Sequence, residues 1–128
     1  MAKRNASGQA VAEFAAVVPV IVLFIVLLVE VGLLMVNQLA VERAAREAAR
    51  AAAVTGSTLE IQQAARTATG LASSRMTVEI GPRPDTAGMV RVRITYDAAI
   101  RDPFTGMTFF RLQLHATAAM RVEDQQLL

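Results

Sequence analysis

The sequence has no cysteine and only one histidine, His115, among its 128 residues. Without cysteine the chain forms no disulfide and has no thiolate nucleophile. His115 stands between the polar residues Gln113 and Thr117 in an alternating segment, so we expect it on the exposed side of a strand, and no serine or acid is spaced from it as in a catalytic triad. The phosphate-binding motifs GxxxxGKS/T and GxGxxG are also missing. We therefore predict that the protein is not an enzyme.

Clusters of metal-ligating side chains are scarce as well. The nearest approaches are two pairs of acids, Asp97 with Asp102 and Glu123 with Asp124. A metal site needs more ligands than a pair supplies, so we expect both pairs at the ends of strands. The sequence predicts no metal, no cofactor and no small-molecule substrate.

An excess of charge is the third absence. The net charge is only +2, and Lys3 and Arg4 account for it, so the rest of the chain is balanced. Arg43, Arg46 and Arg50 share roughly one helix face, which would suit nucleic acid, but glutamates interrupt that face. We expect a solvated surface there and predict no nucleic-acid partner.

What the sequence has is one long apolar run, residues 14–36, broken only by Glu30. As a helix this run would be about 34 Å long, against about 30 Å for the hydrocarbon layer of a bilayer. It has no polar stripe at the helical period, unlike a helix in a soluble core. We predict a leader at residues 1–8 and a membrane-spanning helix over residues 9–36.

Several polar or helix-bending residues mark positions along this span. Lys3 and Arg4 precede it, which predicts a cytoplasmic N-terminus and places residues 37–128 outside. Pro19 removes a backbone hydrogen bond and is expected to kink the helix. Glu30 falls near the outer boundary, where its carboxylate either reaches water or contacts another subunit.

Residues 37–128 are expected to form a small α+β domain. Alanine continues the membrane helix to about residue 54, and residues 57–69 read as a second, shorter helix capped by Ser57 or Thr58. A seam of mostly small residues on the long helix is expected to admit close packing: Leu33, Val36, Ala40, Ala44, Ala48 and Ala51.

Three segments then alternate apolar and polar residues: 76–80, 90–97 and 111–122. Loops join them, so they predict a three-stranded antiparallel sheet with one apolar face, covered by the two helices. The second loop, residues 101–110, contains three phenylalanines at positions 104, 109 and 110. They suit either a binding patch or packing in the core or against a partner, and we expect packing.

The segment GQAVAEF at residues 8–14, with the apolar run and the alanine-arginine helix behind it, resembles the TadE-like family of pilus-assembly proteins. Its pattern is a glycine, four residues, a glutamate and an aromatic, which Gly8, Glu13 and Phe14 match. Similar proteins also have a proline early in the span, as at Pro19, and an acid near its end, as at Glu30. The resemblance is strong over residues 8–54 and loose beyond, and it implies a pilin-like fold.

The resemblance also implies a function. Such proteins serve the tight-adherence, Flp-type branch of the type IV pilus machinery in the bacterial inner membrane, where a prepilin peptidase cuts after the glycine, here between Gly8 and Gln9. Glu13 would then pair with the new α-amino group of its own or a neighbouring chain, or else be a hydrated residue beside an uncut anchor. The implied role is a minor pilin or pseudopilin, whose partners are other pilin subunits and assembly-platform proteins. The alternatives are an uncleaved scaffold of that machinery and an anchored binding domain that uses the phenylalanine loop.

Overall fold

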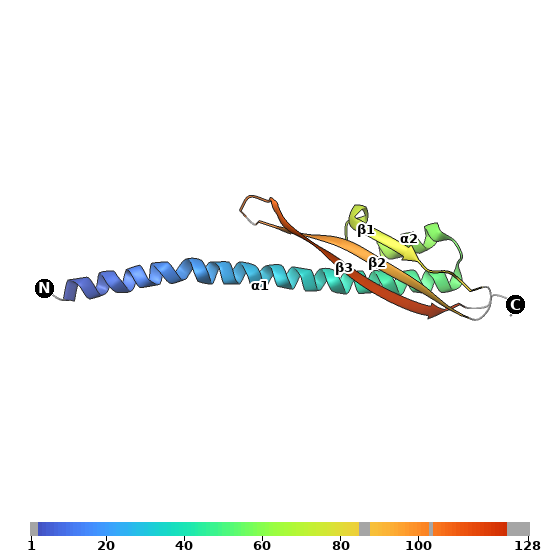
Figure 1. The fold of residues 1–128 in the computed structure, drawn as a ribbon, viewed down its shortest axis with the longest axis horizontal. Helices are drawn as coiled ribbons and strands as arrows, with labels where there is room; N and C mark the ends of the chain where they lie inside the picture. The colour runs from blue at the N-terminus through green and yellow to red at the C-terminus, as the bar shows by residue number, and fades with distance from the viewer. Residues whose placement is uncertain (1–2, 85–87, 103, 123–128) are drawn as a thin grey trace. The chain divides into compact units, whose positions relative to one another are not determined.

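The computed structural model describes residues 3–84, 88–102 and 104–122. It confirms the α+β class, with a long N-terminal helix, a short second helix and a three-stranded antiparallel sheet (Figure 1). Glu123 and Asp124 lie outside the described residues. In chain order the elements are α1 (Lys3–Val54), α2 (Thr58–Thr67), η1 (Ser73–Arg75), β1 (Met76–Ile80), β2 (Met89–Arg101) and β3 (Thr108–Arg121).

The chain divides into two compact units, Met1–Leu33 and Leu34–Leu128, and α1 contributes to both. In the N-terminal unit the helix passes through Pro19 without a break, while the predicted kink there stays a prediction. Its large apolar side chains are exposed, and none of its most apolar stretch is buried by the protein itself. By length and composition α1 is able to cross a membrane.

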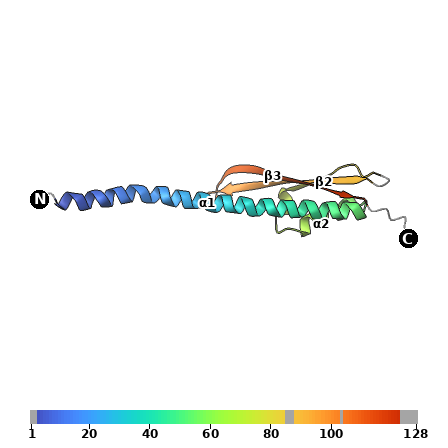
Figure 2. The same ribbon diagram turned by 90° about the horizontal axis from the view of Figure 1, so that it is seen from below.

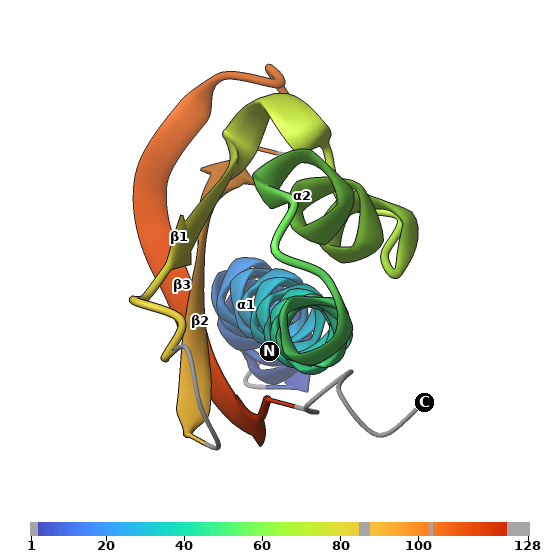
Figure 3. The ribbon, with the colours of Figure 1, turned by 90° about the vertical axis from the view of Figure 1, so that its right-hand side faces the viewer.

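In the C-terminal unit, the apolar face of the sheet packs on the alanine-rich part of α1. The strands are ordered β1-β2-β3, and both pairs are antiparallel. Figures 2 and 3 show β2 and β3 beside this part of α1, with α2 next to the helix as well. The core consists mainly of alanines from α1 and of β-branched residues from β2 such as Val92 and Ile94. The two helices cover the sheet, as expected.

The predicted seam on α1, expected to admit close packing of another helix, coincides only in part with the stripe that faces the sheet. Leu33 and Val36 are exposed, and the buried stripe is wider than the seam and begins at Val41. A flat sheet needs a helix stripe about 100° wide, whereas a narrow seam suits a second helix. The buried residues of this stripe are Val41, Ala44, Ala45, Ala48, Ala49, Ala52 and Ala53.

The second helix begins where the capping signal predicts. The Ser57 hydroxyl accepts a hydrogen bond from the Glu60 backbone N–H at 3.5 Å, which satisfies one of the free donors of the first turn. Ile61 and Ala65, one turn apart, are buried against the rest of the core. The helix ends at Thr67, two residues before the predicted end.

Two strands are longer than predicted, although the residues that extend them, AAI at 98–100 and TFF at 108–110, do not alternate between apolar and polar. β2 extends to Arg101 and β3 starts at Thr108, so most of the expected loop 101–110 belongs to a hairpin. The pairing is irregular beside Ile100 and Arg101, where β3 contains an extra residue. Phe104 lies in the connection between the two strands, and Phe109 and Phe110 lie in the first part of β3.

Candidate functional site

Gly8 lies inside α1, and nothing in the fold requires a glycine there. Among the described residues only Gly106 has a positive φ, so Gly8 needs no special backbone conformation. A Cβ at Gly8 would meet no atom within 4 Å. Glycine inside a helix costs about 1 kcal/mol relative to alanine. The local structure therefore gives Gly8 a cost and no benefit.

Directly after Gly8, two polar side chains of the same helix interact. Gln9 Nε2 donates a hydrogen bond to Glu13 Oε1 at 3.1 Å, across the i, i+4 spacing that places both on one face. Phe14 follows as an exposed aromatic ring at the start of the apolar run. The backbone nitrogen of Gln9 is thus one helical turn from the only carboxylate in residues 8–14. The segment places an acid beside the amine that cleavage after Gly8 would create.

The remaining residues singled out from the sequence are scattered over the two units. Glu30 is half-buried along α1, and His115 is exposed on β3, as expected. Asp97 lies within β2 instead of at its end, so that expectation was wrong, whereas Asp102 follows the last residue of its strand. In the described part of the chain no group of three or more metal-ligating side chains is found.

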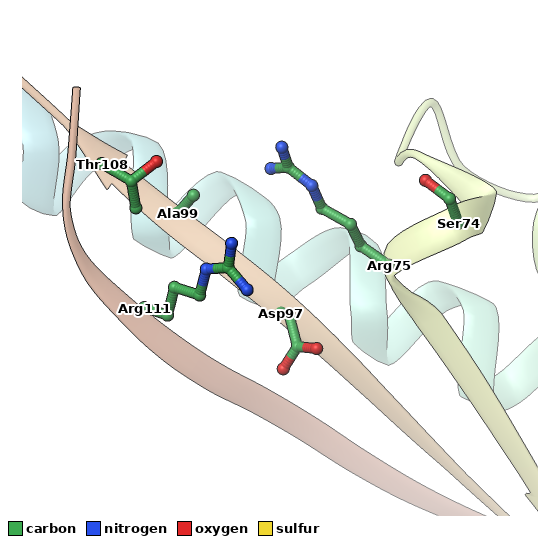
Figure 4. A pocket seen from close by; sticks show the side chains of 6 residues that line it. All are labelled: Ser74, Arg75, Asp97, Ala99, Thr108 and Arg111. Atoms are coloured by element: carbon green, nitrogen blue, oxygen red, sulfur yellow. The ribbon is translucent and has the colours of Figure 1, made fainter. Parts of the chain in front are cut away.

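A shallow pocket of about 290 Å³ lies on the polar face of the sheet (Figure 4). Arg75 and Arg111 line it with guanidinium groups, and Asp97 adds a carboxylate. Among the residues that the structure describes, no polar or charged residue is buried. The pocket therefore lacks the desolvated groups that typically carry catalytic pKa shifts.

The phenylalanines do not pack in the core, which was one of the two kinds of packing expected, while packing against a partner stays a prediction. All the large apolar residues at the end of the β2–β3 hairpin are exposed, by 83% for Phe104, 70% for Met107, 81% for Phe109 and 59% for Phe110. Phe110 pairs with Ile100 on the face of the sheet that elsewhere forms the core. The alternation in the sequence predicted that Phe110 lies on the core face of the sheet. It did not predict that the hairpin extends beyond the residues that cover this face.

A compact turn holds these residues in place. The Asp102 carboxylate accepts hydrogen bonds from the backbone N–H groups of Phe104 at 3.0 Å and Thr105 at 3.1 Å, and from the Thr105 hydroxyl. Gly106 adopts a φ of 70° and donates its N–H to the Asp102 carbonyl at 2.8 Å. The Thr105 hydroxyl, followed by the Phe104 N–H, holds the pKa of the Asp102 carboxyl below its ordinary value of 3.8.

We expect this turn to loosen in acid. The pKa of Asp102 is lower in the folded chain than its ordinary value of 3.8. The ionised carboxylate therefore stabilises the turn fully above pH 3.8, and this stabilisation is lost as the pH falls through the lower pKa of the folded chain. A carboxyl-carbon NMR titration of the full chain in micelles should give Asp102 a pKa below 3.8, with the Phe104 amide shift following it. Thr105→Val should move that pKa upward. An Asp102 pKa at or above 3.8 in the unaltered chain would contradict the turn geometry.

Comparison with known proteins gives one match. The family model described as TadE-like protein matches residues 8–50, which include Gly8, Glu13, Phe14, Pro19 and Glu30. The resemblance seen in the sequence is thereby confirmed for this segment. No curated protein and no solved structure matches the chain.

Proposed function

We propose that the chain is a minor pilin or pseudopilin of a Flp-type pilus system, from the premise that its residues 8–50 match the TadE-like family model. The family match indicates involvement in Tad pilus assembly, and the long apolar helix indicates a single-pass membrane protein. We propose further that a prepilin peptidase removes residues 1–8 on the cytoplasmic side. The mature chain then begins at Gln9, with the C-terminal unit outside the cytoplasm.

The observation that carries this proposal is Gly8. Its helical backbone and open surroundings leave no reason for glycine in the fold, although alanine would stabilise the helix. A protease that binds its substrate in an extended form requires the helix to unwind at the bond to be cut. Glycine destabilises the helix at that bond. A requirement of the peptidase accounts for a residue that the fold does not require.

The protein would act by packing and not by turnover. In the N-terminal unit the apolar side chains of α1 are exposed, so lipid or the helices of other subunits must cover them. Partners of this kind are other pilin or pseudopilin subunits and the proteins of the assembly platform. The uncleaved scaffold is the second candidate, in which the Gln9 side chain would remain the hydrogen-bond partner of Glu13.

Intact-mass measurement of the protein from its native membrane tests the proposal. We expect a mass that corresponds to residues 9–128, and Gly8→Leu should yield the full-length chain instead. Gly32→Leu is a matched control, because Gly32 is also helical and open on all sides within 4 Å, so its variant should still be cut. A full-length unaltered chain, or equal cleavage of the Gly8 variant, would refute processing at Gly8.

A further inference from the structure

The end of the β2–β3 hairpin gathers large apolar side chains that none of the described residues of the unit covers. We call residues 104–110 the hairpin tip. Its four large apolar residues, Phe104, Met107, Phe109 and Phe110, are all more than half exposed. Single exposed apolar residues are common on protein surfaces, but four large ones within seven residues at one tip suggest a surface that binds something.

Contacts within the C-terminal unit show which way this hairpin points. Gln38 Nε2 donates a hydrogen bond to the His115 carbonyl at 3.3 Å. Farther along both elements, Glu42 and Arg46 line one groove together with Thr117 and Ala118. Residue numbers therefore rise in the same direction along α1 and along β3, so the helix and the strand run parallel. The residues that precede His115 on β3 must extend toward the Leu34 end of the unit.

That end is where the chain enters its apolar run. Val36, the last residue of the run, precedes Gln38 by about 3 Å along a helix. Phe110 precedes His115 by about 16 Å along a strand. Even if β3 were inclined by about 45° to α1, Phe110 would extend about 11 Å beyond the level of Gln38. The hairpin tip therefore reaches the level at which the apolar part of α1 begins.

The chemistry of the hairpin suits a lipid interface. Aromatic rings and methionine bury favourably at the boundary between headgroups and acyl chains. Arg101 and Arg111 are exposed on the strands that flank the tip, where guanidinium groups can bind lipid phosphates. The nearest acid, Asp102, has its carboxylate turned into the hydrogen bonds of the turn. An apolar end with a basic border matches an anionic bilayer surface.

We propose that the hairpin tip inserts into the interface of the same bilayer that α1 enters, as a second attachment of the C-terminal unit. A protein partner is the competing occupant, but this end of the unit borders lipid by the continuity of the chain itself. Two attachments would restrict rotation of the C-terminal unit about α1. The proposal requires only that α1 spans the membrane, so it stands whether or not residues 1–8 are removed.

The chain has no tryptophan, so an introduced one reports its own surroundings. The full chain carrying Phe109→Trp is reconstituted into vesicles of phosphatidylcholine and phosphatidylglycerol with brominated acyl chains. We expect blue-shifted emission and at least about twofold quenching relative to unbrominated vesicles, as for a ring buried at the acyl boundary. Met89→Trp is the matched control, because Met89 is exposed at the opposite end of β2. Its emission should remain that of a residue in water.

Two results would overturn the proposal. One is unquenched, water-like emission from Phe109→Trp in these vesicles. The other is quenching that disappears as the protein-to-lipid ratio is lowered, which would assign the tip to contacts between chains. A second measurement follows the anionic lipid, since Arg101→Gln with Arg111→Gln should remove any gain in quenching produced by phosphatidylglycerol. Near-ultraviolet circular dichroism of Tyr96, which is buried in the core, verifies that each variant is folded.

Discussion

Replacing Ala48 by leucine is expected to lower the free energy of unfolding of the C-terminal unit by about 3 kcal/mol, because a larger side chain overpacks the core. Ala48 is fully buried in the stripe of α1 that faces the sheet, and it shares the core with Val92 and Ile94. Alanine lets the helix approach the strands closely. Three added carbon atoms must displace either the helix or the neighbouring side chains.

Urea unfolding of the full chain in detergent micelles measures this effect. Tyr96 is the only tyrosine and is buried in the core, so its fluorescence reports the C-terminal unit alone. Glu47→Leu is the matched control, since it inserts the same side chain one residue earlier on the exposed face and should change stability by about 0.5 kcal/mol or less. Equal losses for both variants would show that alanine at position 48 does not set the spacing between helix and sheet.

Local periodicity predicted the elements of this fold correctly. An apolar run without a polar stripe gave the long helix, and alternation at a period of two gave all three strands. The cap at Ser57 also formed as predicted, because its hydrogen bond joins residues only three positions apart. These features depend on interactions between residues that are only a few positions apart. Such interactions can be predicted from the spacing of residues in a single sequence.

The errors arose where distant segments decide the outcome. The side of α1 that becomes buried depends on where the sheet lies. The sequence contains two overlapping rows of alanine on this helix, and either could form the face that packs on the sheet. The exposure of Phe110 depends likewise on how far the covering residues extend along the sheet, since its place in the alternation is that of a core residue. The hydrogen bond from Gln38 to the His115 carbonyl, which aligns helix and strand, has no sequence signal at all.

The candidate processing segment shows a different limit. Helical spacing predicts that Gln9 and Glu13 share a face, and the structure adds their hydrogen bond. No periodicity predicts a cut after Gly8, however, because the requirement belongs to another protein. Only the resemblance of residues 8–14 to a family supplied that expectation, and the family match covers the same residues.

Glu13→Gln is expected to leave the leader cleavable but to reduce assembly at least about tenfold. Cleavage after Gly8 would convert the Gln9 nitrogen into a charged amine, one turn from the Glu13 carboxylate. At the edge of the lipid an unpaired carboxylate is costly, so pairing with the amine of the same or a neighbouring chain stabilises both charges. Loss of an interaction worth about 1.4 kcal/mol shifts the equilibrium tenfold. Glutamine keeps the size of the side chain and its hydrogen bonding but removes the charge.

The measurement is the fraction of the chain recovered in filaments sheared from cells, with intact mass recording cleavage in the same samples. Glu13→Asp retains the charge and should assemble better than Glu13→Gln, although its shorter side chain reaches less far. Glu47→Gln, on the exposed face of α1 in the C-terminal unit, should assemble normally as a matched loss of charge. If Glu13→Gln is cleaved and assembles as well as the unaltered chain, the carboxylate has no role in pairing. If it is no longer cleaved, Glu13 serves recognition by the peptidase, and assembly must then be tested on chains that begin at Gln9.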